Sequence, residues 1–91
     1  MRVELVFFSV LRHCLPPHAE GHEAAVDVAE DTTLAELLSQ FGVPERLGVP
    51  SSAQVHETGW QVLVNGRWRR DVGKKLENGD RIAIFPPMAG G

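Results

Sequence analysis

The stretch Arg81-Ile82-Ala83-Ile84-Phe85, followed by Pro86-Pro87-Met88-Ala89-Gly90-Gly91, decides the organisation of the chain. Residues 81–85 alternate, with Ile82 and Ile84 on one side and Ala83 and Phe85 on the other, which predicts a strand. The two prolines favour an extended course, and six residues at roughly 3.1 Å each reach about 18 Å. Glycine carries no side chain, so the two terminal glycines can enter a narrow channel. We therefore expect a sheet strand that continues into an extended tail.

A second strand is predicted at the start of the chain, from Met1 to Phe8. Val3, Leu5 and Phe7 fall on one side of it, while Val6 and Phe8 interrupt the polar side. This strand and residues 81–85 are expected to lie side by side as a parallel pair. Val6, Phe8, Ala83 and Phe85 would then share the outer face of the sheet as an apolar patch of the kind that marks a partner interface. The alternative is that these side chains belong to the core.

The middle of the chain predicts one main helix, from Thr33 to Phe41. Four apolar residues have helical spacing, Thr33 and Glu36 form a capping box, and Gly42 stands where the helix should stop. Residues 23–29 alternate weakly as a strand, and the Asn65-Gly66 pair predicts a tight hairpin after a strand at residues 60–64. Residues 12–22 are expected to be a loop. Residues 43–59 are expected to be a long connection with one helical turn near residues 44–47.

The order of these elements predicts an α+β fold: a mixed sheet of about four to five strands packed on one main helix. We expect a folded domain at residues 1–86 and an extended tail at residues 87–91. The ending Phe-Pro-Pro-x-x-Gly-Gly (residues 85–91) resembles that of the ubiquitin-like sulfur carriers of the ThiS/MoaD family, most closely the small subunit of molybdopterin synthase. The resemblance implies the ubiquitin-like β-grasp fold over the whole chain.

The same resemblance implies a chemistry for the tail. The carboxylate of Gly91 would be adenylated, converted to a thiocarboxylate, and would then give up its sulfur, while Gly90, Ala89, Met88 and Pro87 would be recognised by partners. The partners implied are a ubiquitin-activating-type adenylyltransferase, a sulfurtransferase and the large subunit of a synthase. Neither G-x-x-x-x-G-K-[ST] nor G-x-G-x-x-G occurs in the sequence. We therefore expect no bound cofactor, ATP used in trans by the activating enzyme, and a carrier rather than an enzyme.

Two alternatives stay open at this point. The sulfur could go instead to the thiazole of thiamine, to cysteine or to tRNA. The chain could also be a non-covalent ubiquitin-like interaction module that binds through its sheet. The free Gly-Gly end separates these classes, because only a carrier requires it.

Composition limits the remaining functions. The 91 residues are 43% hydrophobic and 23% charged, with a net charge of −3, which argues against nucleic acid as a partner. The longest apolar run is too short to cross a bilayer, and no signal peptide is recognised, so we expect no membrane association and a cytoplasmic location. The single cysteine, Cys14, has no partner for an internal disulfide and is expected to act as a small hydrophobe.

Two further clusters are weighed and set aside. His13, Cys14, His18 and His22 share one segment but match no zinc spacing, so no metal site is expected. Arg67-Trp68-Arg69-Arg70 with Lys74-Lys75 is expected to be a solvated hairpin whose tryptophan covers an edge of the core. Docking onto an acidic partner surface is the second interpretation of this basic segment, and binding to nucleic acid is the third.

Overall fold

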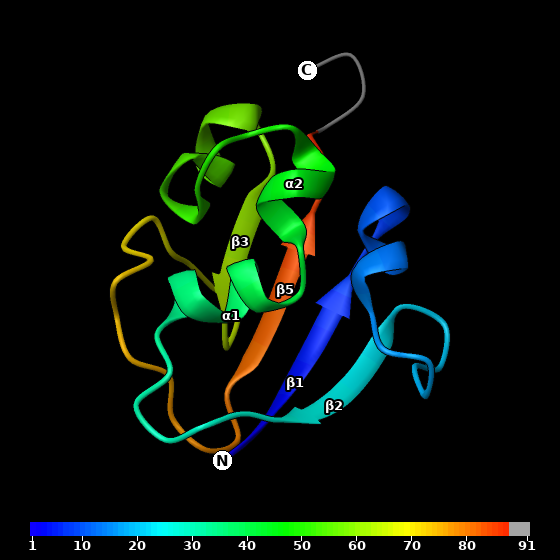
Figure 1. The fold of residues 1–91 in the computed structure, drawn as a ribbon, viewed down its shortest axis with the longest axis vertical. Coiled ribbons are helices and arrows are strands. Elements are labelled where there is room, and N and C mark those ends of the chain that lie inside the picture. Colours follow the sequence, from blue (N-terminus) through cyan, green and yellow to red (C-terminus); the bar gives the residue numbers. More distant parts are fainter. Residues whose placement is uncertain (88–91) are drawn as a thin grey trace.

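The computed structural model describes residues 1–87 and shows one mixed sheet with helices packed on one of its faces (Figure 1). The strands are β1 (Arg2–Phe7), β2 (Glu23–Asp27), β3 (Gln61–Val64), β4 (Arg67–Trp68) and β5 (Arg81–Phe85), in the order β2-β1-β5-β3-β4. The helices are α1 (Leu34–Gln40) and α2 (Val43–Leu47), with 3₁₀ helices η1 (Ser9–Cys14) and η2 (Ser52–Thr58). The α+β architecture expected from the sequence is confirmed.

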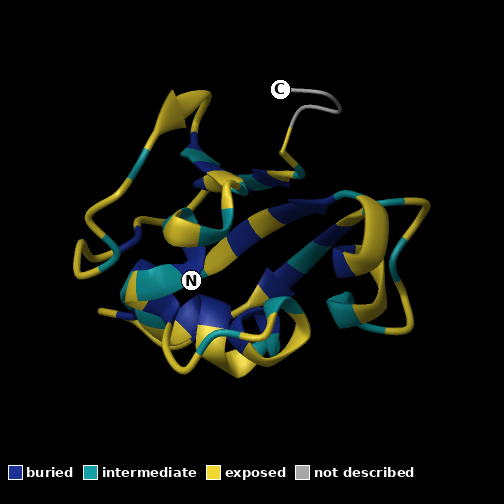
Figure 2. Ribbon diagram, turned by 90° about the horizontal axis from the view of Figure 1, so that it is seen from above, coloured by how far each residue is buried: buried dark blue, intermediate teal, exposed yellow. Residues whose placement is uncertain are grey.

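The parallel pair of β1 and β5 forms the centre of the sheet, as predicted. Leu5 lies opposite Ile82 and Phe7 opposite Ile84, and all four side chains are fully buried. Figure 2 shows how buried and exposed positions alternate along the strands. One face of this pair therefore packs against the helices and forms the core.

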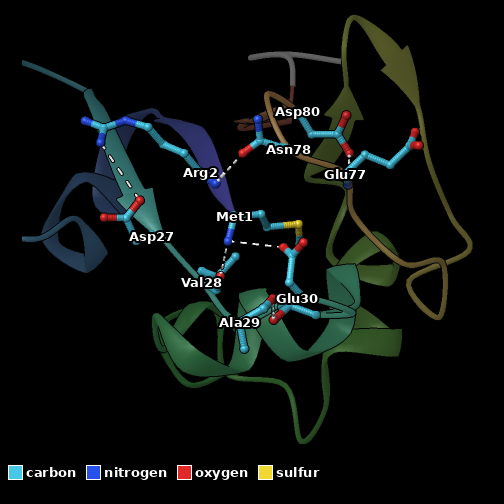
Figure 3. Close-up of polar contacts among 10 residues, drawn as sticks. Met1, Arg2, Asp27, Val28, Ala29, Glu30, Glu77, Asn78 and Asp80 are labelled. Carbon is cyan, nitrogen blue, oxygen red and sulfur yellow. Dashed lines mark hydrogen bonds and ion pairs between the residues drawn. The ribbon is translucent and has the colours of Figure 1, made fainter.

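Strand β2 pairs with β1 in antiparallel register, so the strands adjacent in sequence are neighbours in space. The beginning of β1 is held by several contacts (Figure 3). The amino group of Met1 donates to the Val28 carbonyl at 2.7 Å and lies 3.2 Å from the Glu30 carboxylate. The amide of Arg2 donates to Oδ1 of Asn78 at 2.8 Å. These bonds connect the start of β1 to the segments that follow β2 and precede β5.

Helix α1 begins at the capping box predicted from the sequence. The Thr33 hydroxyl accepts from the Glu36 amide at 3.1 Å, and the Glu36 carboxylate accepts from the Thr33 amide at 2.9 Å. The next amides of the first turn find partners in a segment far along the chain: Leu34 donates to the Lys74 carbonyl and Ala35 to the Val72 carbonyl. The amino-terminal donors of α1 thus join the helix to the connection between β4 and β5.

The connection at residues 43–59 has more structure than expected. The helical turn predicted near residues 44–47 is present as α2, but a second helical segment, η2, follows it. Val55 of η2 is 1% exposed, and the buried Ser52 hydroxyl donates to the Ala35 carbonyl at 2.9 Å. Residues 12–22 differ in the same way, because η1 runs to Cys14 and buries Leu11 completely. Each of these segments is ordered by burying one apolar side chain against the core.

The hairpin at Asn65-Gly66 is confirmed. Both residues have positive φ, 54° and 81°, as a tight turn between two antiparallel strands requires. Asn65 also bonds to the turn that precedes β5: its side chain donates to Oδ1 of Asp80 at 2.9 Å and accepts from the Arg81 amide at 2.9 Å. This polar network holds β3 and β5 in register at one end of the sheet.

The capping box generates a prediction about stability. Replacing Thr33 with alanine should lower the free energy of unfolding by about 1 kcal/mol, because one backbone donor loses its acceptor. The bonds from Thr33 also lower the pKa of Glu36. A carboxyl with a lowered pKa adds stability above its unfolded pKa and loses that stability as the pH falls through its folded value.

Urea denaturation of the wild type, Thr33→Ala and Thr33→Ser, each at neutral and at acidic pH, tests this prediction. The serine variant keeps the hydroxyl and should remain close to the wild type. The difference between wild type and Thr33→Ala should shrink in acid. An alanine variant as stable as the wild type would show that the box contributes nothing.

Candidate functional site

The outer face of the sheet lies opposite the helices, and its side chains come from alternate positions of the strands. Where Ile82 and Ile84 point into the core, Ala83 and Phe85 point the other way, as the alternation predicts. Val6 of β1 lies opposite Ala83 of β5, which lies opposite Leu63 of β3. A row of small and medium apolar side chains therefore crosses the three central strands.

Beside this row, two residues further along the chain from Val6 and from Ala83, three rings form what we call the aromatic cluster: His22, Phe8 and Phe85. Phe8 and Phe85 are stacked, with ring centroids 4.7 Å apart and planes inclined by 19°. Phe8 also meets the His22 ring at 4.4 Å between centroids. Phe8 is half-buried and Phe85 is 37% exposed. Stacking covers one side of each phenylalanine and leaves the Phe85 ring partly open to solvent.

These contacts settle where the predicted interface residues lie. The prediction that Val6, Phe8 and Phe85 share one side of the sheet is confirmed by the strand register and by the ring stacking. Val6 is 3% exposed, so it presents little surface to a partner, contrary to the expectation that it forms part of an exposed patch. Phe8 and Phe85 are not core residues. Whether they meet a partner stays a prediction.

A small ion cluster lies beside the apolar row, on the same face. The Arg81 guanidinium contacts the Glu4 carboxylate at 3.0 Å and the Glu23 carboxylate at 3.1 Å. All three side chains are about half exposed, so water screens the attraction and its contribution to stability is small. The cluster instead fixes three side chains across β2, β1 and β5. No local pattern predicts this cluster, because the residues that meet lie up to 77 positions apart.

The basic segment after the hairpin differs from expectation in one respect. Trp68 is 57% exposed and does not cover an edge of the core; Trp60 packs against the core instead. The Arg70 guanidinium lies 4.8 Å from the centre of the Trp68 ring, a cation–π contact. The shortness of β4 explains the error: the strand has only two residues, both exposed, at the edge of the sheet.

Cys14 and its histidine neighbours do not form a site. Cys14 is half-buried against the core, and burial raises the pKa of its thiol, an effect that nearby Arg46 opposes and Glu45 reinforces. His18 contacts the Ala25 carbonyl, and His22 belongs to the aromatic cluster. Within residues 1–87 no three His, Cys, Asp or Glu side chains are arranged to hold a metal ion. In the same residues no helix has the length and apolar character needed to cross a membrane.

The tail begins directly beside the aromatic cluster. Strand β5 ends at Phe85, and Pro86 and Pro87 follow. Of the residues predicted for tail recognition and chemistry, Pro87 is exposed, while Met88, Ala89, Gly90 and Gly91 lie outside the described residues. The predicted division into a domain at 1–86 and a tail at 87–91 stays a prediction.

The exposure of Phe85 generates a second stability prediction. Phe85→Ala should lower the free energy of unfolding by about 1 kcal/mol, mainly the loss of stacking on Phe8. Ile84→Ala, one position earlier and fully buried, should cost about 2–5 kcal/mol. Urea denaturation of both variants provides the comparison. Equal costs for the two substitutions would place Phe85 in the core.

Comparisons with known proteins agree with this geometry. The model of the ThiS family matches residues 5–91. The structure of SAMP1, small archaeal modifier protein 1, from Haloferax volcanii is 27% identical, with a TM-score of 0.66 and all of both chains covered. No curated protein matches the chain in sequence.

Two further solved structures are similar at lower identity and show the fold alone. A putative molybdopterin converting factor subunit 1 from Pyrococcus furiosus is 20% identical, with a TM-score of 0.68 and 96% of this chain and 98% of that chain covered. A complex of subunits 1 and 2 of molybdopterin-converting factor from Helicobacter pylori contains a chain that is 23% identical, with a TM-score of 0.59 and both chains covered in full. The family match over residues 5–91, which includes the Gly-Gly ending, shows that the chain belongs to the ThiS family of ubiquitin-like sulfur carrier proteins.

Proposed function

We propose that this chain carries sulfur on the carboxylate of Gly91, as the small subunit of a synthase that makes molybdopterin. The observation that carries the proposal is that the tail follows the central strand β5. The central strand ends at the partly exposed Phe85, two prolines follow directly, and the sequence continues to Gly-Gly. A partner that covers the aromatic cluster would have the tail within reach of its own active site.

The chemistry requires an activating enzyme. The carboxylate is ionised at neutral pH and is a poor acyl donor. Attack of a carboxylate oxygen on the α-phosphate of ATP releases pyrophosphate and forms an acyl adenylate. Hydrosulfide, or an equivalent sulfur donor supplied by a sulfurtransferase, then displaces AMP and leaves the thiocarboxylate. The sequence has no nucleotide-binding motif of its own, so we place ATP on an adenylyltransferase and treat the chain as carrier rather than enzyme.

The molybdopterin pathway is the finer part of the proposal. The H. pylori structure is a complex of subunits 1 and 2 of a molybdopterin-converting factor, and its similar chain matches the present one over its full length. By analogy, a large subunit would receive the tail here and hold the sulfur acceptor. Thiamine thiazole, cysteine and tRNA are the alternative acceptors, and they use the same thiocarboxylate.

The likeness to SAMP1 favours a second candidate function, modification of proteins. The first step is shared, because an acyl adenylate reacts with either sulfur or nitrogen nucleophiles. A lysine amine that displaced AMP would form an isopeptide bond with Gly91. The non-covalent interaction module is disfavoured by the family match, which extends through the Gly-Gly end.

The first prediction of this proposal concerns the mass of the protein. Incubation with the adenylyltransferase of the same organism, ATP and a sulfur donor should raise the intact mass by the difference between sulfur and oxygen. Deletion of Gly91 should abolish the change without altering the melting temperature, because Gly91 lies six residues beyond the last strand. Pyrophosphate release without any thiocarboxylate, and with lysine adducts instead, would favour the modifier function. A wild-type chain that is never adenylated would contradict both.

The second prediction concerns the docking surface. Phe85→Ala should weaken binding to the adenylyltransferase or to the synthase large subunit roughly 30-fold, because an aromatic anchor in an interface centre contributes about 2 kcal/mol or more. Val10→Ala is the matched control, since Val10 is an exposed apolar residue of η1, 46% exposed, outside the strands that form the sheet face. Calorimetric titration measures both. Equal affinities for the two variants would remove Phe85 from the interface.

A further inference from the structure

Gly59 lies where the chain leaves η2 and enters β3, next to the start of the tail. The register of β3 and β5 places Gln61 opposite Phe85. Continuing this antiparallel register by two residues places Gly59 opposite Pro87. Pro86 and Pro87 have no amide hydrogen, so they cannot extend the sheet through their own donors. Gly59 and Pro87 therefore meet through van der Waals contact.

Gly59 leaves little space for a side chain beside Pro87. A Cβ atom added to Gly59 would lie 3.1 Å from Cγ and 3.4 Å from Cβ of Pro87, and the first of these distances is tighter than nine in ten real Cβ contacts. Gly59 also has φ of 90°, a conformation that costs any other residue energy. Among the described glycines with positive φ, Gly59 alone would place a Cβ against the tail.

The surroundings of Gly59 are held in place. Its amide donates to the His56 carbonyl at 3.3 Å, which ends η2. The next residue, Trp60, packs against the core, and Gln61 is already paired with Phe85. Pro87 therefore rests on a backbone position that is fixed from both sides. Because proline also restricts its own φ, the contact leaves Pro87 few alternative positions.

We propose that Gly59 is a positioning residue for the tail: because it has no side chain, Pro87 can lie against it, and this placement sets the point from which the tail starts. This inference rests on the proposed function, since the placement matters only when a partner must receive the Gly91 carboxylate. A partner anchored on Phe85 fixes the domain two residues before Pro87. An error of about 1 Å in the position of a reacting group can cost up to 100-fold in rate.

The test compares Gly59→Leu with Gly79→Leu. Gly79 has φ of 89°, almost the same as Gly59, and a Cβ there would meet nothing within 4 Å. It lies just before β5, at the end of the sheet opposite to the tail (Figure 1). The backbone cost of leucine should be similar at both sites, so the two urea midpoints should be similar. Only Gly59→Leu should displace Pro87.

Two measurements test whether Pro87 is displaced in Gly59→Leu and whether the displacement affects the reaction. Adenylation, measured as ATP–pyrophosphate exchange with the activating enzyme, should fall about 10-fold or more in kcat/KM for Gly59→Leu and stay near the wild type for Gly79→Leu. In NMR spectra of the free wild type, the Gly59 Hα protons should show contacts to the Pro87 ring. The amide shifts of residues 88–91 should change in Gly59→Leu and not in Gly79→Leu.

The possible outcomes distinguish failure of the inference from failure of the proposed function. Absence of the Gly59–Pro87 contact in wild-type spectra, or equal adenylation of both leucine variants, overturns the inference. Failure of the wild type itself to be adenylated refutes the proposed function before any variant is compared, while the NMR measurement still decides whether the contact exists. If Gly59→Leu does not fold, Pro87→Ala can replace it in the test, because this variant removes the proline ring that lies against Gly59. That variant should melt like the wild type yet shift the same amides and lose adenylation, and normal adenylation by it would also overturn the inference.

Discussion

The parallel pairing of β1 with β5 is the interaction on which the rest of the structure depends. Leu5 and Ile82, which lie opposite each other, are 77 positions apart in the sequence. Closing so long a loop costs conformational entropy that only extensive burial can offset. The inward side chains of both strands supply that burial, because Leu5, Phe7, Ile82 and Ile84 have no exposed surface. The pairing also determines where the tail starts, since β5 ends beside β1 in the middle of the sheet.

The same pairing produces two faces of different character. The inner face gains its stability from closely packed aliphatic side chains. The outer face has half-exposed ion pairs, a buried Val6 and a stacked but open Phe85. The outer face therefore contributes less to folding than the inner one. A change at Phe85 should therefore disturb the fold less than a change at a core residue.

Sequence patterns predicted the structural features that depend on residues close together in the chain. The capping box of α1, the Asn65-Gly66 turn and the alternation of β5 each lie within a few residues, and each is confirmed. Alternation alone also placed Phe8 and Phe85 on one side. The unpredicted features need partners far along the chain: η2 is ordered by burial of Val55, and Arg81 meets Glu4 and Glu23. Gly59 is the left-handed residue that ends η2, but its closeness to Pro87, 28 positions later, depends on a part of the chain that no local pattern includes.

These observations indicate how specificity is divided between the tail and the domain. Two glycines offer a partner only backbone groups, so any channel narrow enough for glycine accepts them from any carrier with this ending. Discrimination among such carriers must therefore come from side chains elsewhere. The aromatic cluster at the end of β5 and the Arg81–Glu4–Glu23 contacts on the same face of the sheet together offer both shape and charge. Under the proposed function, a partner that recognises this surface would select the chain, and the prolines with Gly59 would then determine where the Gly91 carboxylate arrives.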